Sequence, residues 1–207
     1  TAGTFAFTTP ATVPPAGAYS ASVTFTPTDA TSYTPAIGAV NVIVSPVATG
    51  TIYYVNNTNP SCSDAGTGLT IPLPFCMIGR GVTAALAGDT VRVLAGTYAE
   101  TVTMVRSGSA GNPITFSADP GVTVTGAASY GFRVSGRSYI TIDGFNITDT
   151  TDRGIYASAS DNIIISNNHI SLSGSPVSGS TQPGIHFDTT TNSTISGNTT
   201  DHNSSHG

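Results

Sequence analysis

The chain has 207 residues and a formal net charge of −5, with six arginines, no lysine and a single glutamate among eleven acidic residues. So few and scattered cations exclude a nucleic-acid-binding surface, which needs clustered Lys and Arg, and the composition also excludes a coiled coil or helix bundle. The sequence contains 34 Thr and 32 Val plus Ile against five Leu, and this favours β structure because β-branched side chains suit pleated strands. No apolar run approaches the ~20 residues that a membrane-spanning helix needs.

The first part of the chain reads as a separate β unit. Strand-like runs at 4–7, 19–25 and 39–44 are separated by Pro- and Gly-containing turns, and residues 45–50 read as a linker. Three or four strands make only half of a β-sandwich. The stretch from GTFAF to NVIV, with its FTPTD motif, resembles the C-terminal part of a bacterial immunoglobulin-like repeat. The resemblance implies such a repeat at residues 1–46 whose start is missing, so we predict that the N-terminus is an artificial cut.

Two cysteines, Cys62 and Cys76, lie close together in the sequence. A metal site needs more ligands and no His lies near either Cys, while a redox pair more typically shows Cys-x-x-Cys. A disulfide is therefore favoured over both alternatives, and it indicates an oxidising compartment. A bridge that closes a loop of this length contributes ~3 kcal/mol.

One helix is predicted over residues 75–87, with Met77, Ile78, Val82, Ala85 and Leu86 on one apolar face and a stop at Gly88-Asp89. Strands are expected to follow it at 90–94, 101–105, 113–117 and 122–125.

The last third of the chain contains an internal repeat. The segments Phe132–Gly154, Ile155–Gly184 and Ile185–Gly207 align, and the middle one carries extra residues within 172–183. A unit of two or three short strands cannot bury its apolar side alone, whereas stacked units form one continuous core. The alignment predicts a right-handed parallel β-helix, against the alternative of a β-sandwich with two face-packed antiparallel sheets. The aligned asparagines are expected to stack as ladders: Asn168 with Asn198, and Asn162 with Asn192.

A family resemblance extends this prediction. The stretches that carry it are YYVNN at 53–57, CSDAGTG at 62–68, PFC at 74–76, AGDTVRVLAGTYAETV at 87–102, SGSAGNPITFSA at 107–118, YITIDGFNIT at 139–148 and NIIISNNHI at 162–170. They resemble the secreted right-handed β-helix proteins of the pectate-lyase-like superfamily. The resemblance implies an all-β chain in which residues 47–207 are an N-terminal capping helix and the first coils of a truncated β-helix, in a protein that is secreted or on a bacterial cell surface. Because the chain stops where another coil is due, the C-terminus is also predicted to be a cut.

In lyases of this superfamily the substrate groove runs along one parallel sheet, and the first strand of each aligned unit is its counterpart here. The predicted outward columns give Arg133, Tyr156, His186 and Asp188 as candidate substrate-binding residues, with Ser135 and Ser158 beside them. Arg pairs with carboxylates and a Tyr ring packs on a pyranose face. The alternative is that these are ordinary solvated strand positions. The extra loop within 172–183 is expected to flank this column.

Other polar residues are weaker candidates. Four aspartates offer oxygens to calcium but lack calcium-loop spacing and suit turns, and three histidines offer a metal site but are expected to be solvated. We predict no metal site and no evident cofactor in this chain, with calcium a candidate only for a longer protein. These residues are Asp143, Asp149, Asp152, Asp161, His169, His202 and His206.

Two functions from different classes remain open. The first is a carbohydrate-active protein that binds an acidic polysaccharide, with cleavage by β-elimination as a further step. Lyases of this superfamily use a Lys or Arg base with calcium, and this chain has no Lys, so either the catalytic coils lie beyond residue 207 or the protein is not a lyase. The second is a non-catalytic cell-surface or adhesin-type stalk. The sequence predicts no nucleic-acid partner, and it does not predict an oligomeric state.

Overall fold

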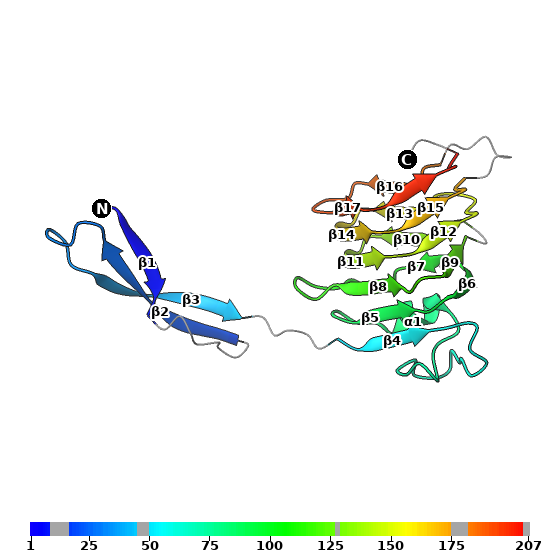
Figure 1. Cartoon of the computed structure of the whole chain (residues 1–207), viewed down its shortest axis with the longest axis horizontal. Helices are drawn as coiled ribbons and strands as arrows, with labels where there is room; N and C mark the ends of the chain where they lie inside the picture. The colour runs from blue at the N-terminus through cyan, green and yellow to red at the C-terminus, as the bar shows by residue number, and fades with distance from the viewer. Residues whose placement is uncertain (9–16, 45–49, 127–128, 175–181, 205–207) are drawn as a thin grey trace. The chain divides into compact units, whose positions relative to one another are not determined.

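The chain divides into two compact units, Thr1–Ala48 and Thr49–Gly207 (Figure 1). The computed structural model describes residues 1–8, 17–44, 50–126, 129–174 and 182–204. The predicted linker and domain boundary at residue 46 lie outside these residues, as does most of the predicted insertion loop. No helix in the described ranges has the length and apolar character needed to cross a membrane.

The first unit contains one antiparallel sheet in the order β1-β2-β3. Its strands are β1 (Gly3–Phe7), β2 (Gly17–Pro27) and β3 (Ala36–Val44). Phe5 lies opposite Phe25, with their ring centroids 4.9 Å apart. The unit leaves large apolar side chains such as Phe5 and Ile43 exposed. The antiparallel strands are consistent with one sheet of an incomplete sandwich, and the immunoglobulin-like assignment stays a prediction.

The second unit is a parallel β-helix, as the internal repeat predicted. Its described strands form three sheets, which run β7-β10-β13-β16, β4-β5-β8-β11-β14-β17 and β6-β9-β12-β15-β18 (Figure 1). Every strand pair within these sheets is parallel, which excludes the sandwich alternative. The strands are β4 (Ile52–Val55), β5 (Thr90–Val93), β6 (Gly96–Ala99), β7 (Val102–Thr103), β8 (Ile114–Ala118), β9 (Val122–Thr125), β10 (Phe132–Ser135), β11 (Ser138–Asp143), β12 (Asn146–Thr148), β13 (Ile155–Ser158), β14 (Asp161–Ser166), β15 (His169–Ser171), β16 (Ile185–Asp188), β17 (Thr194–Ser196) and β18 (Thr199–Asp201).

The strand register matches the predicted alignment of the repeat. Phe132 pairs with Ile155, and Ile155 pairs with Ile185. In the next sheet, Ile142 pairs with Ile165, which pairs with Ile195. Alternate residues of each strand point inward, because side chains alternate across a strand, and the successive coils stack these inward residues into one core.

Single residues in the left-handed conformation turn the chain between sheets. Gly144, Asn167 and Gly197 occupy the same corner of three successive coils, with φ values of 81°, 55° and 65°. Gly and Asn are the residues that adopt this conformation most readily. A short polar or absent side chain at this corner therefore lets two strands meet with almost no loop between them.

Of the two predicted asparagine ladders, the structure forms one. The Asn168 side chain donates to Asn198 Oδ1 at 2.9 Å and to the Ile142 carbonyl at 3.0 Å inside the corner. Asn162 and Asn192 do not bond to each other in this way, because both amides donate to Asp161. That carboxylate is the stronger acceptor and lies between them.

A short helix, α1 (Ile78–Ala84), contacts β4, β5 and β7. It is shorter than predicted because Met77 and Ala85 are both extended, and Met77 and Leu86 are exposed instead of lying on the apolar face. No side chain of the helix caps its start. Instead, Glu100 accepts the Ile78 and Gly79 N–H groups at 2.8 and 2.9 Å.

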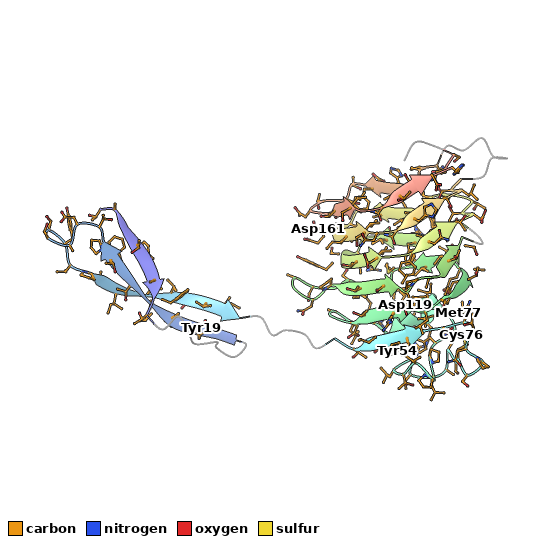
Figure 2. All side chains as sticks on the ribbon, in the orientation of Figure 1. Tyr19, Tyr54, Cys76, Met77, Asp119 and Asp161 are labelled. Carbon is orange, nitrogen blue, oxygen red and sulfur yellow. A yellow bond between two sulfur atoms is a disulfide. The ribbon has the colours of Figure 1, made fainter. Side chains whose placement is uncertain are left out.

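The predicted disulfide is present between Cys62 and Cys76, immediately before α1 (Figure 2). The Asp64 carboxylate, which lies inside the disulfide loop, accepts the backbone N–H groups of Cys76 and Met77. The bridge and these hydrogen bonds hold the loop that leads into the helix.

Candidate functional site

The β7–β10–β13–β16 sheet carries the predicted column on its outer side. Arg133 pairs with Tyr156, and Tyr156 pairs with His186. Their strand neighbours Phe132 and Ile155 are buried, so alternation turns the column outward. On the side of β10 away from Tyr156, Thr103 of β7 pairs with Arg133, so Thr103, Arg133, Tyr156 and His186 form one row across the sheet.

Aromatic rings stack along this row from coil to coil. The Tyr130 and Tyr156 rings are 5.5 Å apart with an interplanar angle of 16°, and the Tyr156 and His186 rings are 5.5 Å apart at 43°. Burial, followed by a hydrogen bond to Asp152, raises the pKa of Tyr130 above its usual value. Tyr130 therefore stays a neutral phenol across the physiological range and offers an apolar ring face.

Two arginines lie over these rings. The Arg133 guanidinium carbon is 5.9 Å from the centre of the Tyr130 ring, and that of Arg153 is 4.8 Å from the centre of the Tyr156 ring, both within the range of cation–π attraction. Arg153 also pairs with Asp152 at 2.8 Å. Arg133, by contrast, forms no ion pair with any residue that the structure describes.

We call Tyr130, Arg133, Arg153, Tyr156 and His186 the aromatic–arginine face. Sequence reasoning named three of these residues and missed Tyr130 and Arg153. Both stand immediately before the glycine that precedes an aligned strand, and this shared position relative to the strand start was the signal in the sequence. The position lies outside the strands, where alternation does not predict which way a side chain points.

Acidic and hydroxyl groups border the face on one side. The Tyr156 hydroxyl donates to Asp188 Oδ2 at 3.3 Å, and the Ser158 hydroxyl donates to Ser135 Oγ at 3.2 Å. The structure thus brings the predicted Asp188 next to the column. The face therefore has a carboxylate beside His186 at one end and the guanidinium of Arg133 nearer the other.

The weaker candidates lie in separate polar contacts. Asp143 accepts from Ser166 and Asn167, Asp161 from Thr191 and Asn192, and His169 faces Asn146 and Asp201. Asp149 accepts from Thr148, Asp152 pairs with Arg153, and His202 faces Asp201. His206 lies outside the described residues. Across the described parts of the chain, no three His, Cys, Asp or Glu side chains gather closely enough to hold a metal ion.

A cavity of about 400 Å³ lies elsewhere, at the corner that follows the third sheet. Its lining includes Asp149, Leu172 and His202, which are left-handed residues at equivalent positions of three coils. It includes no residue of the aromatic–arginine face. That face is an open strip along the sheet and suits an extended ligand better than an enclosed small molecule.

Comparison with known proteins supports the fold. The family model described as "Right handed beta helix region" matches residues 107–207. The uncharacterized protein YwoF of Bacillus subtilis (strain 168) is 35% identical over 138 residues, which cover 58% of this chain and 29% of YwoF.

Solved structures give the same picture at lower identity. The GH136 lacto-N-biosidase from Eubacterium ramulus superimposes with a TM-score of 0.62 at 14% identity, over 73% of this chain and 34% of that chain. A rhamnogalacturonan lyase gives 0.51 at 19% identity, over 74% of this chain and 52% of that one. The second unit is therefore a right-handed parallel β-helix, the fold that these solved structures share. The chain spans about a third or less of the length of YwoF and of the lacto-N-biosidase.

Proposed function

We propose that the aromatic–arginine face binds an acidic polysaccharide. The observation that carries the proposal is Arg133, a guanidinium without a carboxylate partner in the described structure, beside a stack of two tyrosine rings. A guanidinium accepts a carboxylate through two parallel hydrogen bonds, and this geometry suits a uronate. An unpaired arginine held over a ring is pre-positioned for such a ligand.

The geometry of the sheet supports a polymer as the ligand. Neighbouring strands of a sheet lie ~4.8 Å apart, so equivalent side chains of successive coils form a straight row. Along this row the chain presents a cation at Arg133, an aromatic ring at Tyr156 and polar atoms at His186, and the Tyr130 ring stacks on that of Tyr156 from the turn before β10. The names of the two solved structures above, a biosidase and a lyase, describe carbohydrate-active proteins and support a carbohydrate partner.

We extend the proposal from binding to cleavage of the polysaccharide by β-elimination. In β-elimination a base removes the proton α to the uronate carboxylate, and a cation stabilises the charge that develops. Arg133 has the chemistry for the second role, with calcium as the further cation in a longer protein. We assign no base among the described residues. The oxidised Cys62–Cys76 pair supports a secreted or cell-surface location.

A stalk is the second candidate function. The observation that favours it is the unbroken parallel register from β7 to β18, which makes a stiff rod whatever its surface binds. In a stalk the aromatic–arginine face has no ligand. Binding measurements therefore separate the two functions.

The test compares two arginine variants of the whole chain. R133Q removes the cation of the face that has no ion-pair partner. R92Q also removes one positive charge, but Arg92 lies on β5 of another sheet and is paired with Asp119. We expect wild type and R92Q to bind polygalacturonate equally and R133Q to bind about tenfold or more weakly, as for loss of a charged hydrogen bond. A neutral glucan and a sulfated glycan serve as comparison ligands, with calcium or a chelator added in parallel.

The outcomes are distinct. Equal binding by R133Q and R92Q contradicts the assignment of the site, and no binding by wild type contradicts the binding function and favours the stalk. Ultraviolet absorbance of an unsaturated uronate product reports cleavage separately from binding. If wild type binds the neutral glucan as strongly as polygalacturonate, the choice of an acidic ligand is contradicted.

A further inference from the structure

The hydrogen bond between Arg153 and His186 fixes where the imidazole proton lies. Arg153 Nε donates to His186 Nδ1 at 2.6 Å. A guanidinium has only donors, so Nδ1 must accept through its lone pair. A neutral imidazole carries one N–H, and in this arrangement it must be at Nε2. His186 Nε2 has no hydrogen-bond partner among the described residues.

Arg153 is itself held in place before any ligand arrives. Its Nη1 contacts Asp152 Oδ1 at 2.8 Å, and its guanidinium lies over the Tyr156 ring. Its side chain is 22% exposed. An ion pair, a ring contact and partial burial together restrict the donor to one orientation.

A second histidine offers an internal contrast. His202 Nδ1 lies 3.1 Å from Asp201 Oδ2, and a carboxylate only accepts. His202 Nδ1 must therefore carry a proton, so a neutral His202 is the opposite tautomer to His186. The same chain thus holds both arrangements.

We propose that Arg153 is a positioning residue that fixes His186 as the Nε2–H tautomer, so that His186 offers the ligand of the aromatic–arginine face a hydrogen-bond donor and not a base. The part that concerns the ligand rests on the function proposed above, while the tautomer does not. With Arg133 and Nε2–H on the same row, the face selects a ligand that is rich in acceptor oxygens. The proton-abstracting base of an elimination is then not the neutral His186.

The tautomer is tested on the full chain without ligand. In a ¹⁵N-labelled sample at pH 8, we expect His186 Nδ1 to resonate as an unprotonated ring nitrogen and Nε2 as a protonated one. In R153M, which keeps the aliphatic stem but removes the donor, we expect His186 to shift toward a mixture of tautomers while His202 is unchanged. A protonated Nδ1 in neutral wild-type His186 overturns the proposal, as does a tautomer ratio that R153M leaves unaltered. The wild-type spectrum decides the point even if R153M fails to fold.

The donor role is tested by two substitutions at His186. Gln retains an N–H donor, whereas Phe keeps a ring beside Tyr156 and has none. We expect H186Q to bind polygalacturonate within about threefold of wild type and H186F to bind about tenfold more weakly. Equal binding by H186F and H186Q overturns the donor role. Absence of binding by wild type overturns the proposed function and the ligand contact together, and the ligand-free spectrum then still decides the tautomer.

Discussion

The two compact units use the same alternation of apolar and polar residues with opposite results. In the first unit, the alternating strands β1 to β3 form a single sheet, and Phe5 is 75% exposed. In the second, the alternating strands wrap around an axis, and Phe132 is 0% exposed. Alternation decides which face of a strand is apolar, but only the connections between strands decide whether that face is covered.

The corners of the β-helix explain the difference. A single left-handed residue such as Asn167 turns the chain into the next sheet, so each inward side chain meets others from the opposite sheets. The antiparallel pairing of β1, β2 and β3 returns the chain beside itself within one plane. One apolar face of that plane meets nothing in the described unit. The same substitution should therefore have unequal effects in the two units.

The largest expected effect comes from truncating a buried ring. Phe132→Ala removes a ring whose centroid is 4.8 Å from that of Phe145 and 6.4 Å from that of Phe116, and we expect a loss of ~3–5 kcal/mol in the free energy of unfolding. Phe5→Ala, the matched change in the first unit, should cost less than ~1 kcal/mol because the ring is mostly in water. Chemical denaturation of both variants checks this. Similar losses would show that the first unit buries Phe5 against a surface outside the described unit.

The next effect concerns the disulfide that immediately precedes α1. Replacing Cys62 and Cys76 together by Ser opens a loop with a sequence separation of 14. Restoring that freedom to the unfolded chain should cost ~3 kcal/mol of stability. The unfolding transition of the β-helix should move to lower denaturant concentration, and a reducing agent should move the wild-type transition equally. A wild-type transition that is insensitive to reductant would contradict this.

The sequence predicted the parts of the fold that repeat. The column of Phe132, Ile155 and Ile185 was visible because a stacked coil places equivalent residues at equivalent positions, and the strands paired as aligned. Strands β4 and β6 were not predicted as strands, because β4 (IYYV) shows no alternation of apolar and polar residues and β6 (GTYA) contains Gly and Ala, which are depleted in strands. Short strands without a repeat lack the period that identifies them.

The candidate site was partly predictable for the same reason. Arg133, Tyr156 and His186 occupy strand positions, so alternation alone placed them outward. Tyr130 and Arg153 lie in turns, where the direction of a side chain depends on backbone dihedrals that the sequence pattern does not encode. The tautomer of His186 depends on a single contact from such a turn residue, and no sequence pattern could have indicated it.

A smaller effect is expected at the start of α1. Glu100→Gln replaces a carboxylate that accepts two backbone N–H groups with an amide that has one acceptor oxygen, at a cost of about 1 kcal/mol. Burial raises the pKa of Glu100, and the hydrogen bonds from Gly79 and Ile78 offset this only in part. The folded chain therefore holds this proton to a higher pH than the unfolded chain does. Wild-type stability should fall as pH rises through the raised pKa, and E100Q should lack that slope in denaturation curves. A wild-type slope that persists in E100Q would assign it to another group.

The smallest effect should appear at the far end of the β-helix, where Asp161 links two coils. Its carboxylate accepts from Thr191 Oγ1 and from Asn192 Nδ2, both at 2.7 Å, and the hydrogen bond from Thr191 is the main cause of a lowered Asp161 pKa. The unfolded chain binds this proton at higher pH than the folded chain. The stabilisation is therefore present above the ordinary Asp pKa and is lost as pH falls through the lowered one.

Because Asp161 is only half-buried, it contributes little to global stability, and global unfolding is too coarse a measure of this link. Amide exchange of the last coil at pH 6 and pH 3, expressed as protection factors, isolates it. Wild type should lose protection at the backbone amides of Thr191 and Asn162 on acidification, whereas Asp161→Asn should show low protection at both pH values. The protection factors of the core amides of β10 and β11 should not change with the substitution, because the Asp161 hydrogen bonds hold only the turn that leads into β17. Equal acid sensitivity in wild type and variant would mean that another group controls the last coil. The Asp201 carboxylate would then be tested by the same measurement, because hydrogen bonds from His169 and then His202 lower its pKa.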